Sequence, residues 1–179
     1  MSTSRRILQR ACLGLAVAMA AGACATNTAA VGQPVTGKQI KQIDASYLPD
    51  TVAGLKVTRE DISKQLVNVS RAYTDRLSLF GLRRGDLLVS TVEVSHFNKS
   101  AQVSSAKFQS SLLARIGSTT PKLYVLSGEK VYLTAGTKQT VAVWFRGQTM
   151  IVLSIRQDYP TPRGLVRQML LLTDNASNA

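Results

Sequence analysis

The stretch QTVAVWFRGQTMIVLSI, residues 139–155, decides the fold. Its two ends, 139–145 and 149–155, are rich in β-branched and aromatic residues and flank a glycine-bearing turn at 146–148, a pattern typical of a β-hairpin. Residues 150–153 are apolar without interruption, so this strand is expected to be covered on both faces. The sequence therefore predicts an antiparallel sheet with 149–155 near its centre.

Further strands are predicted upstream of this hairpin, joined in pairs by glycine-bearing turns. They are 122–126 with 130–134, whose turn is Ser127-Gly128, and 77–82 with 87–97, whose turn is 83–86; Leu55–Val57 is a shorter candidate. Short loops between consecutive strands require antiparallel pairing.

Three helices are predicted from apolar residues at helical spacing. The expected buried faces are Ile62, Leu66, Val69 and Tyr73; Phe108, Leu112 and Ile116; and Leu165, Met169 and Leu172. The expected N-termini are an approximate capping box from Thr58 to Asp61, Ser104-Ser105, and Thr161 followed by Pro162. We therefore expect an α+β fold, an antiparallel β-sheet with about three helices packed on one face.

The N-terminal region predicts a secretory signal peptide. Arg5, Arg6 and Arg10 precede an uncharged apolar run that ends in small residues. The run is shorter than the roughly 20 apolar residues of a spanning helix. General export and twin-arginine export both remain open. The expected organisation is a signal peptide at 1–23, a flexible tether at 24–45, a single α+β domain at 46–173 and a frayed tail at 174–179.

Cys24 is predicted to carry a lipid anchor. The residues Ala21-Gly22-Ala23-Cys24 resemble the lipobox of bacterial lipoproteins, whose cysteine is diacylated and becomes the new N-terminus. No cysteine follows Cys24, so a disulfide cannot explain it in the mature chain. The alternative is ordinary cleavage near Cys24. The resemblance implies export and attachment to the outer face of the cell membrane.

Three segments of the body look like an uncharacterised class of actinobacterial lipoproteins. They are LPDTVAGLKV at 48–57, LRRGDL at 82–87 and VYLTAGTKQ at 131–139. The resemblance extends from Leu48 to Leu172 and implies a location and an architecture. It implies no catalytic residues.

The chain is strongly basic. Its 22 Lys and Arg against 10 Asp and Glu give +12, and loss of the three leader arginines leaves 19 − 10 = +9. The excess is spread along the sequence, which is typical of a solvated surface and also favours anionic partners. The expected partners are the membrane through the lipid anchor, anionic lipid, a cell-wall polymer or another envelope protein. Nucleic acid is excluded by the compartment.

Few residues are candidates for catalysis. His96 is the single histidine, and Glu93 is the one acid inside an apolar strand. Zinc needs three or four suitable ligands and a calcium loop needs alternating acids, and neither pattern occurs. No metal, cofactor or catalytic site is therefore predicted. The leading hypothesis is a non-enzymatic binding or interaction module of the cell envelope, and the alternative is a small cell-wall-directed hydrolase using Glu93 or His96.

Three aromatic residues are candidates for a ligand cleft. Tyr132, Trp144 and Phe145 lie on neighbouring predicted strands, where aromatic side chains can line a pocket. Strand aromatics also form ordinary core, so both interpretations remain open.

Overall fold

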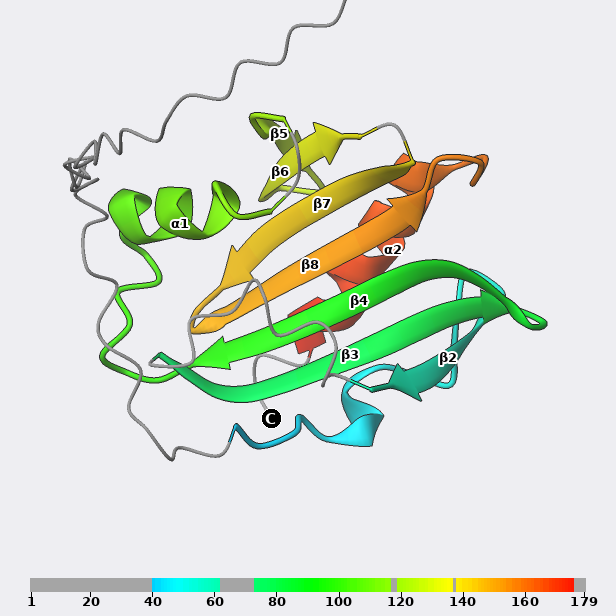
Figure 1. The fold of residues 1–179 in the computed structure, drawn as a ribbon, viewed down its shortest axis with the longest axis horizontal. Coiled ribbons are helices and arrows are strands. Elements are labelled where there is room, and N and C mark those ends of the chain that lie inside the picture. The colour runs from blue at the N-terminus through cyan, green and yellow to red at the C-terminus, as the bar shows by residue number, and fades with distance from the viewer. Residues whose placement is uncertain (1–39, 62–72, 117–118, 137, 176–179) are drawn as a thin grey trace, which may run out of the picture. The chain divides into compact units, whose positions relative to one another are not determined.

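The computed structural model of this protein describes residues 40–61, 73–116, 119–136 and 138–175 (Figure 1). The strands are β1 (Thr51–Val52), β2 (Leu55–Glu60), β3 (Thr74–Arg84), β4 (Leu87–Phe97), β5 (Lys122–Leu126), β6 (Glu129–Ala135), β7 (Gln139–Arg146) and β8 (Thr149–Arg156). The helices are a short 3-10 turn, η1 (Ala45–Tyr47), with α1 (Ala106–Leu113) and α2 (Pro162–Asn175). No helix in these ranges is long and apolar enough to cross a membrane.

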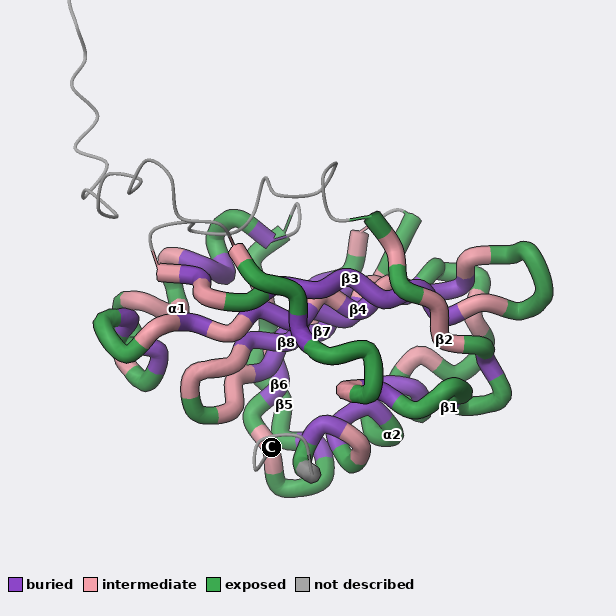
Figure 2. The backbone as a smooth tube through the Cα atoms, turned by 90° about the horizontal axis from the view of Figure 1, so that it is seen from below, coloured by how far each residue is buried: buried purple, intermediate pink, exposed green. Residues whose placement is uncertain are grey.

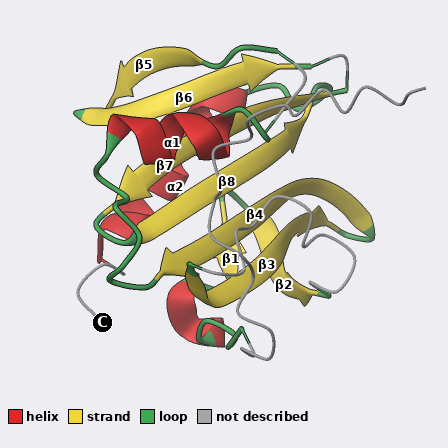
Figure 3. Cartoon of the chain, turned by 60° about the vertical axis from the view of Figure 1, so that its left-hand side comes forward, coloured by secondary structure: helices red, strands yellow, loops and turns green. Residues whose placement is uncertain are grey.

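The eight strands form one antiparallel sheet in the order β1-β2-β3-β4-β8-β7-β6-β5. Each half is a meander of four consecutive strands, and the two halves meet where β4 pairs with β8 (Figure 3). The predicted central position of β8 is confirmed, because β4 and β7 flank it on its two sides.

The two faces of the sheet carry different helices. Ile151 and Leu153 of β8 belong to a core cluster that includes the buried side of α2. Met150 and Val152 of the same strand belong to a second cluster that includes Leu112 of α1 and its neighbours. We call these two surfaces the α2 face and the α1 face. Figure 2 shows the buried band along β3, β4, β7 and β8, with α2 on one side of it.

The predicted α+β arrangement with about three helices on one face is wrong. Within the described ranges there are two α-helices, and they pack on opposite faces of a mostly β structure. The physical reason is the uninterrupted apolar run of β8, because alternate side chains of a strand point to opposite sides and both sides then need cover.

The local predictions had mixed outcomes. The hairpins and the helices at α1 and α2 are confirmed, and α2 begins at the expected Pro162. Thr58 was expected to cap a helix but lies within β2. The helix predicted from Ile62 to Tyr73 falls almost wholly on residues 62–72, which lie outside the described residues.

Residues 40–45, which the sequence assigned to the tether, contact the folded unit. Lys41 forms an isolated parallel bridge with Arg76 of β3. The Ile43 side chain is buried in the core of the α2 face, and its N–H donates to Ser78 Oγ at 2.9 Å.

Candidate functional site

The three predicted aromatic residues divide between the two faces. On the α1 face, the rings of Tyr132 (β6) and Phe145 (β7) meet edge to face, with centroids 6.3 Å apart. Trp144 is fully buried on the α2 face, where its Nε1 donates to Thr173 Oγ1 at 3.4 Å. Neighbouring residues of one strand point to opposite sides. The structure therefore brings Tyr132 and Phe145 together and separates Trp144 from them.

Tyr132 lines a cleft between α1 and the β5–β6 end of the sheet. The cleft has a volume of about 490 Å³, which is within the range of small-molecule sites. It is lined by Ser110, Leu113, Ala114, Thr119, Thr120, Pro121 and Tyr132. Four of these residues carry a hydroxyl group, three are apolar, and none carries a formal charge.

Hydrogen bonds hold two of the lining side chains in place. Tyr132 Oη donates to Gln109 Oε1 of α1 at 3.4 Å, and the Gln109 amide donates to the Val103 carbonyl at 2.9 Å. The hydroxyl oxygens of Thr119 and Thr134 are 2.5 Å apart. The Tyr132 side chain is thus held by Gln109 of α1 and by contact with Phe145, and the Thr119 side chain is held by Thr134 of β6.

Glu93 and His96 do not converge. Glu93 lies on the α1 face, where burial raises the pKa of its carboxyl and a 3.3 Å hydrogen bond from Ser95 Oγ acts in the opposite direction. His96 points to the α2 side, and its Nδ1 is 3.1 Å from Thr149 Oγ1. Neither residue lines the cleft.

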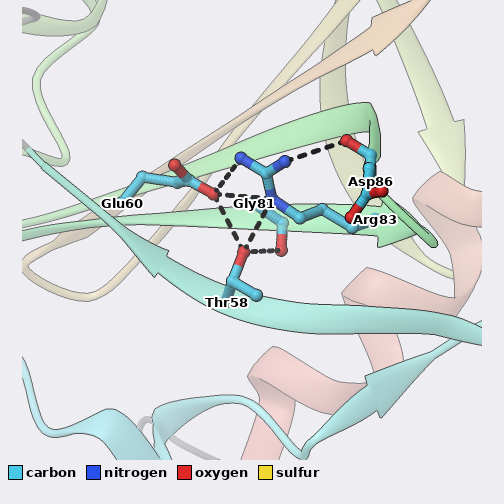
Figure 4. A network of polar contacts seen from close by, with 5 residues as sticks. All are labelled: Thr58, Glu60, Gly81, Arg83 and Asp86. Carbon is cyan, nitrogen blue, oxygen red and sulfur yellow. Dashed lines mark hydrogen bonds and ion pairs between the residues drawn. The ribbon is translucent and has the colours of Figure 1, made fainter.

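A polar network on β2 and β3 was missed by the sequence analysis (Figure 4). Arg83 donates to Glu60 Oε1 through Nη2 at 2.9 Å and through Nε at 3.1 Å. Thr58 Oγ1 donates to the same carboxylate oxygen at 2.9 Å, and Arg83 Nη1 donates to the Asp86 carbonyl at 3.1 Å. The carboxylate lies directly over Gly81 of the neighbouring strand. The two bonds from Arg83 to Glu60 depend on the register between β2 and β3, so local spacing could not have indicated that ion pair.

A second ionic cluster joins the end of α2 to the sheet. The Arg146 side chain is 9% exposed and lies 3.5 Å from Glu129 and 3.3 Å from Asp174. Its Nη1 also lies 3.4 Å from Thr173 Oγ1. Arg146 Nε is buried and has no hydrogen-bond partner among the described residues, so the two ion pairs are made through the Nη atoms alone. Both networks still pair their charged groups within the protein, which is typical of structural roles.

Strand β5 forms one edge of the sheet and is apolar at its surface. Leu123 is 53% exposed, Tyr124 37% and Val125 68%. The guanidinium carbon of Arg163 lies 5.8 Å from the centre of the Tyr124 ring. Lys122 and Lys130 of the same hairpin are exposed. The edge therefore combines apolar side chains with positive charge.

The described part of the chain contains no group of three or more His, Cys, Asp or Glu residues placed to hold a metal ion. Cys24, the predicted lipidation site, lies outside the described residues. Comparison with known proteins gave no match to a family model, a curated protein or a solved structure.

Proposed function

We propose that this protein is a non-enzymatic binding protein of the cell envelope, held at the membrane by lipid on Cys24, whose α1–β6 cleft binds a small neutral ligand with several hydroxyl groups. The observation that carries the proposal is the lining of the cleft, which offers four hydroxyl groups beside apolar surface and no formal charge.

The lining favours a neutral ligand. Transfer of an unpaired charge out of water is strongly unfavourable, and no lining side chain could pair with one. Each hydroxyl can donate and accept a hydrogen bond. A ligand with several hydroxyl groups can therefore exchange its bonds to water for bonds to Ser110, Thr119, Thr120 and Tyr132.

The apolar part of the lining narrows the ligand class further. Leu113, Ala114 and Pro121 contribute carbon surface, and the Tyr132 ring is available as a flat apolar wall. A molecule that presents C–H groups on one side and hydroxyl groups around its rim matches both kinds of surface. A neutral sugar ring has this distribution of groups.

The envelope location is supported by the leader and the Cys24 motif. A binding role is supported over the hydrolase alternative because Glu93 and His96 lie on opposite faces of β4 and away from the cleft. A hydrolase would need an acid or base within hydrogen-bond reach of the reacting bond.

A matched pair of sugars tests the ligand class. We expect methyl glucoside to shift the backbone amide NMR signals of α1 and β6 in the full chain, and the charged analogue methyl glucuronide to shift them at least fivefold less at equal concentration. The glycosidic bond of methyl glucoside should remain intact during the titration. Equal shifts from both sugars, no shifts from either, or cleavage of the bond would each contradict the proposal.

Two variants with a matched control locate the ligand. Thr120→Val keeps the side-chain volume but removes a hydroxyl from the cleft, and Ala114→Trp fills it. Both should weaken the methyl glucoside shifts. Thr140→Val makes the same chemical change on the α2 face and should leave them unchanged. Equal effects of Thr120→Val and Thr140→Val would rule out this cleft as the site.

A further inference from the structure

Strand β5 leaves one side of its backbone without a partner strand in the described part of the chain. It stands at the end of the strand order and pairs with β6 on its other side. An open edge of this kind is a template for a further strand. Edge strands in native proteins are commonly protected by charges or prolines. Pro121 and Lys122 stand at the start of β5, whereas the Leu123-Tyr124-Val125 segment that follows carries neither a charge nor a proline.

The hairpin geometry shows which backbone groups the edge presents. Ser127 and Gly128 both have positive φ, 52° and 83°, which makes a two-residue turn of the type I′ class. The pair that closes such a turn, Leu126 with Glu129, is a hydrogen-bonded pair, and hydrogen-bonded pairs alternate along an antiparallel ladder. The N–H and C=O groups of Leu123 and Val125 therefore point away from β6.

The side chains of the edge divide between the two faces of the sheet. Leu123 is opposite Tyr132 in the register, so Leu123 and Val125 extend the α1 face. Tyr124 is opposite Val131 and lies on the α2 face, where Arg163 packs over its ring. An added strand would place alternate side chains beside these two different surfaces.

The charge of this edge is positive. Lys122, Lys130 and Arg163 are all exposed. The acid of the hairpin, Glu129, lies 3.5 Å from Arg146 and is already in an ion pair. A second copy of this basic chain would bring another positively charged β5 edge against the first, whereas an acidic segment would meet opposite charge. Charge complementarity therefore favours an acidic occupant over self-association.

We propose that β5 binds an extended acidic segment of a partner protein by strand addition. Apolar side chains of that segment lie beside Leu123 and Val125, and acidic side chains in the alternate positions lie beside Lys122 and Arg163. Backbone hydrogen bonds to Leu123 and Val125 supply affinity, and the alternation of side chains supplies specificity. No residue of β5 lines the α1–β6 cleft, although Leu123 pairs with Tyr132 of its lining. The proposal does not depend on the ligand proposed for the cleft.

The test uses a terminally blocked peptide, Glu-Val-Glu-Val-Glu, titrated into the full chain. We expect the backbone amide NMR signals of Leu123 and Val125 to shift with saturation. The Gln-Val-Gln-Val-Gln peptide keeps the valines and the backbone, and we expect it to bind at least fivefold more weakly because it has no charge. Equal affinity of the two peptides would overturn the charge argument. Absence of saturable binding by the acidic peptide would overturn the proposal.

Variants separate the charge contribution from the backbone contribution. Arg163→Glu should weaken binding of the acidic peptide about fivefold, in line with a surface ion pair. Arg84→Glu makes the same change in the hairpin at the other half of the sheet and should have little effect. Val125→Pro removes an outward N–H and should abolish binding. N-methylation of the peptide valines tests the same bonds without altering the protein, so the backbone test stands even if Val125→Pro fails to fold.

Two other possible occupants of the β5 edge would give different experimental results. A dimer in light scattering that Val125→Pro converts to a monomer would identify a second copy as the occupant and overturn the proposal. Binding to phosphatidylglycerol vesicles that Arg163→Glu abolishes, without binding of the acidic peptide, would identify a lipid surface and overturn it as well. Thr120→Val should leave peptide binding unchanged, so failure at the cleft and failure at β5 are distinguishable.

Discussion

Replacing Gly81 by alanine should destabilise the protein, although alanine is normally the better residue in a strand. A Cβ atom at Gly81 would lie 2.3 Å from Glu60 Oε1, 2.9 Å from Leu88 Cδ1 and 3.0 Å from Thr58 Oγ1. The first of these distances is far below any van der Waals contact. The Glu60 carboxylate must therefore move, and it would leave the positions from which it accepts hydrogen bonds.

The expected loss of stability follows from the hydrogen bonds that Glu60 would lose. Glu60 Oε1 accepts from Arg83 at 2.9 and 3.1 Å and from Thr58 at 2.9 Å. Hydrogen bonds to charged groups contribute about 1.5–3 kcal/mol, and the Arg83 and Glu60 side chains, 29% and 24% exposed, will contribute toward the lower end. Alanine is intrinsically favoured over glycine inside a strand, and this preference offsets roughly 0.5–1 kcal/mol of that loss. We expect a net loss of about 1–2 kcal/mol in the free energy of unfolding.

Urea unfolding followed by the fluorescence of Trp144, the single tryptophan and fully buried, measures this quantity. Gly164→Ala is the matched control, because a Cβ there would meet nothing closer than Thr161 Cβ at 3.6 Å. Gly164 lies in α2, so this variant should stabilise the protein by about 0.5 kcal/mol. The two glycine substitutions should thus have opposite signs.

A double-mutant cycle identifies the cause. In a Glu60→Ala background the obstructing carboxylate is absent, so the penalty of Gly81→Ala should fall by at least about 0.5 kcal/mol. If Gly81→Ala proved as stable as the unmodified protein, the Glu60 carboxylate could not lie over Gly81, and the reasoning would be refuted. An unchanged penalty in the Glu60→Ala background would assign the effect to the contacts with Leu88 and Thr58 instead.

Three further predictions concern pH, packing and anchoring. Burial raises the pKa of the Glu93 carboxyl above its value in the unfolded chain. The protein should therefore have its full unfolding free energy below about pH 4.5 and lose part of it as the pH rises through the folded-state pKa. In urea unfolding measured at several pH values, Glu93→Gln should lose less unfolding free energy as the pH rises, and it should be more stable than the unmodified protein at pH 8. Leu153→Ala removes a fully buried side chain from the central strand and should lower the unfolding free energy by about 2–5 kcal/mol. Leu123→Ala, at the exposed edge, should lower it by less than about 1 kcal/mol. Equal losses in the two variants would contradict the assignment of Leu153 to the core and Leu123 to the edge. Intact mass of the membrane-extracted protein should show a chain that begins at an acylated Cys24, and Cys24→Ala should release it from the membrane; a mature mass that begins elsewhere and carries no acyl chains would show that the anchor is not at this residue.

Local chemistry was enough to predict most of the strands. The Ser127-Gly128 turn fixes the β5–β6 hairpin, because both residues adopt the positive φ that this turn needs. Pro162 marks the start of α2 because it lacks the N–H that a first helical residue does not use. These features depend on a few adjacent residues, so they can be read without knowledge of the fold.

Long-range pairing explains what could not be predicted. Thr58 and Asp61 have the spacing of a capping box, but Thr58 pairs with Gly81, a residue 23 positions away, and that pairing extends β2 through it. The cleft likewise needs Ser110, Thr119 and Thr120 to gather around Tyr132, and no spacing along the chain indicates this. In contrast, the separation of Trp144 from Tyr132 could have been predicted, since the alternation of a strand already places Trp144 and Phe145 on opposite sides.

The junction of β4 with β8 also determines when the sheet can be completed. β4 ends at Phe97 and its partner β8 begins at Thr149, so about fifty residues must follow before the two halves can join. A ribosome adding roughly 5–20 residues per second needs several seconds to supply them. During that interval β4 has an open edge, and no β8 is available to cover it. A chain that emerges N-terminus first therefore stays incompletely folded until most of its length has been delivered.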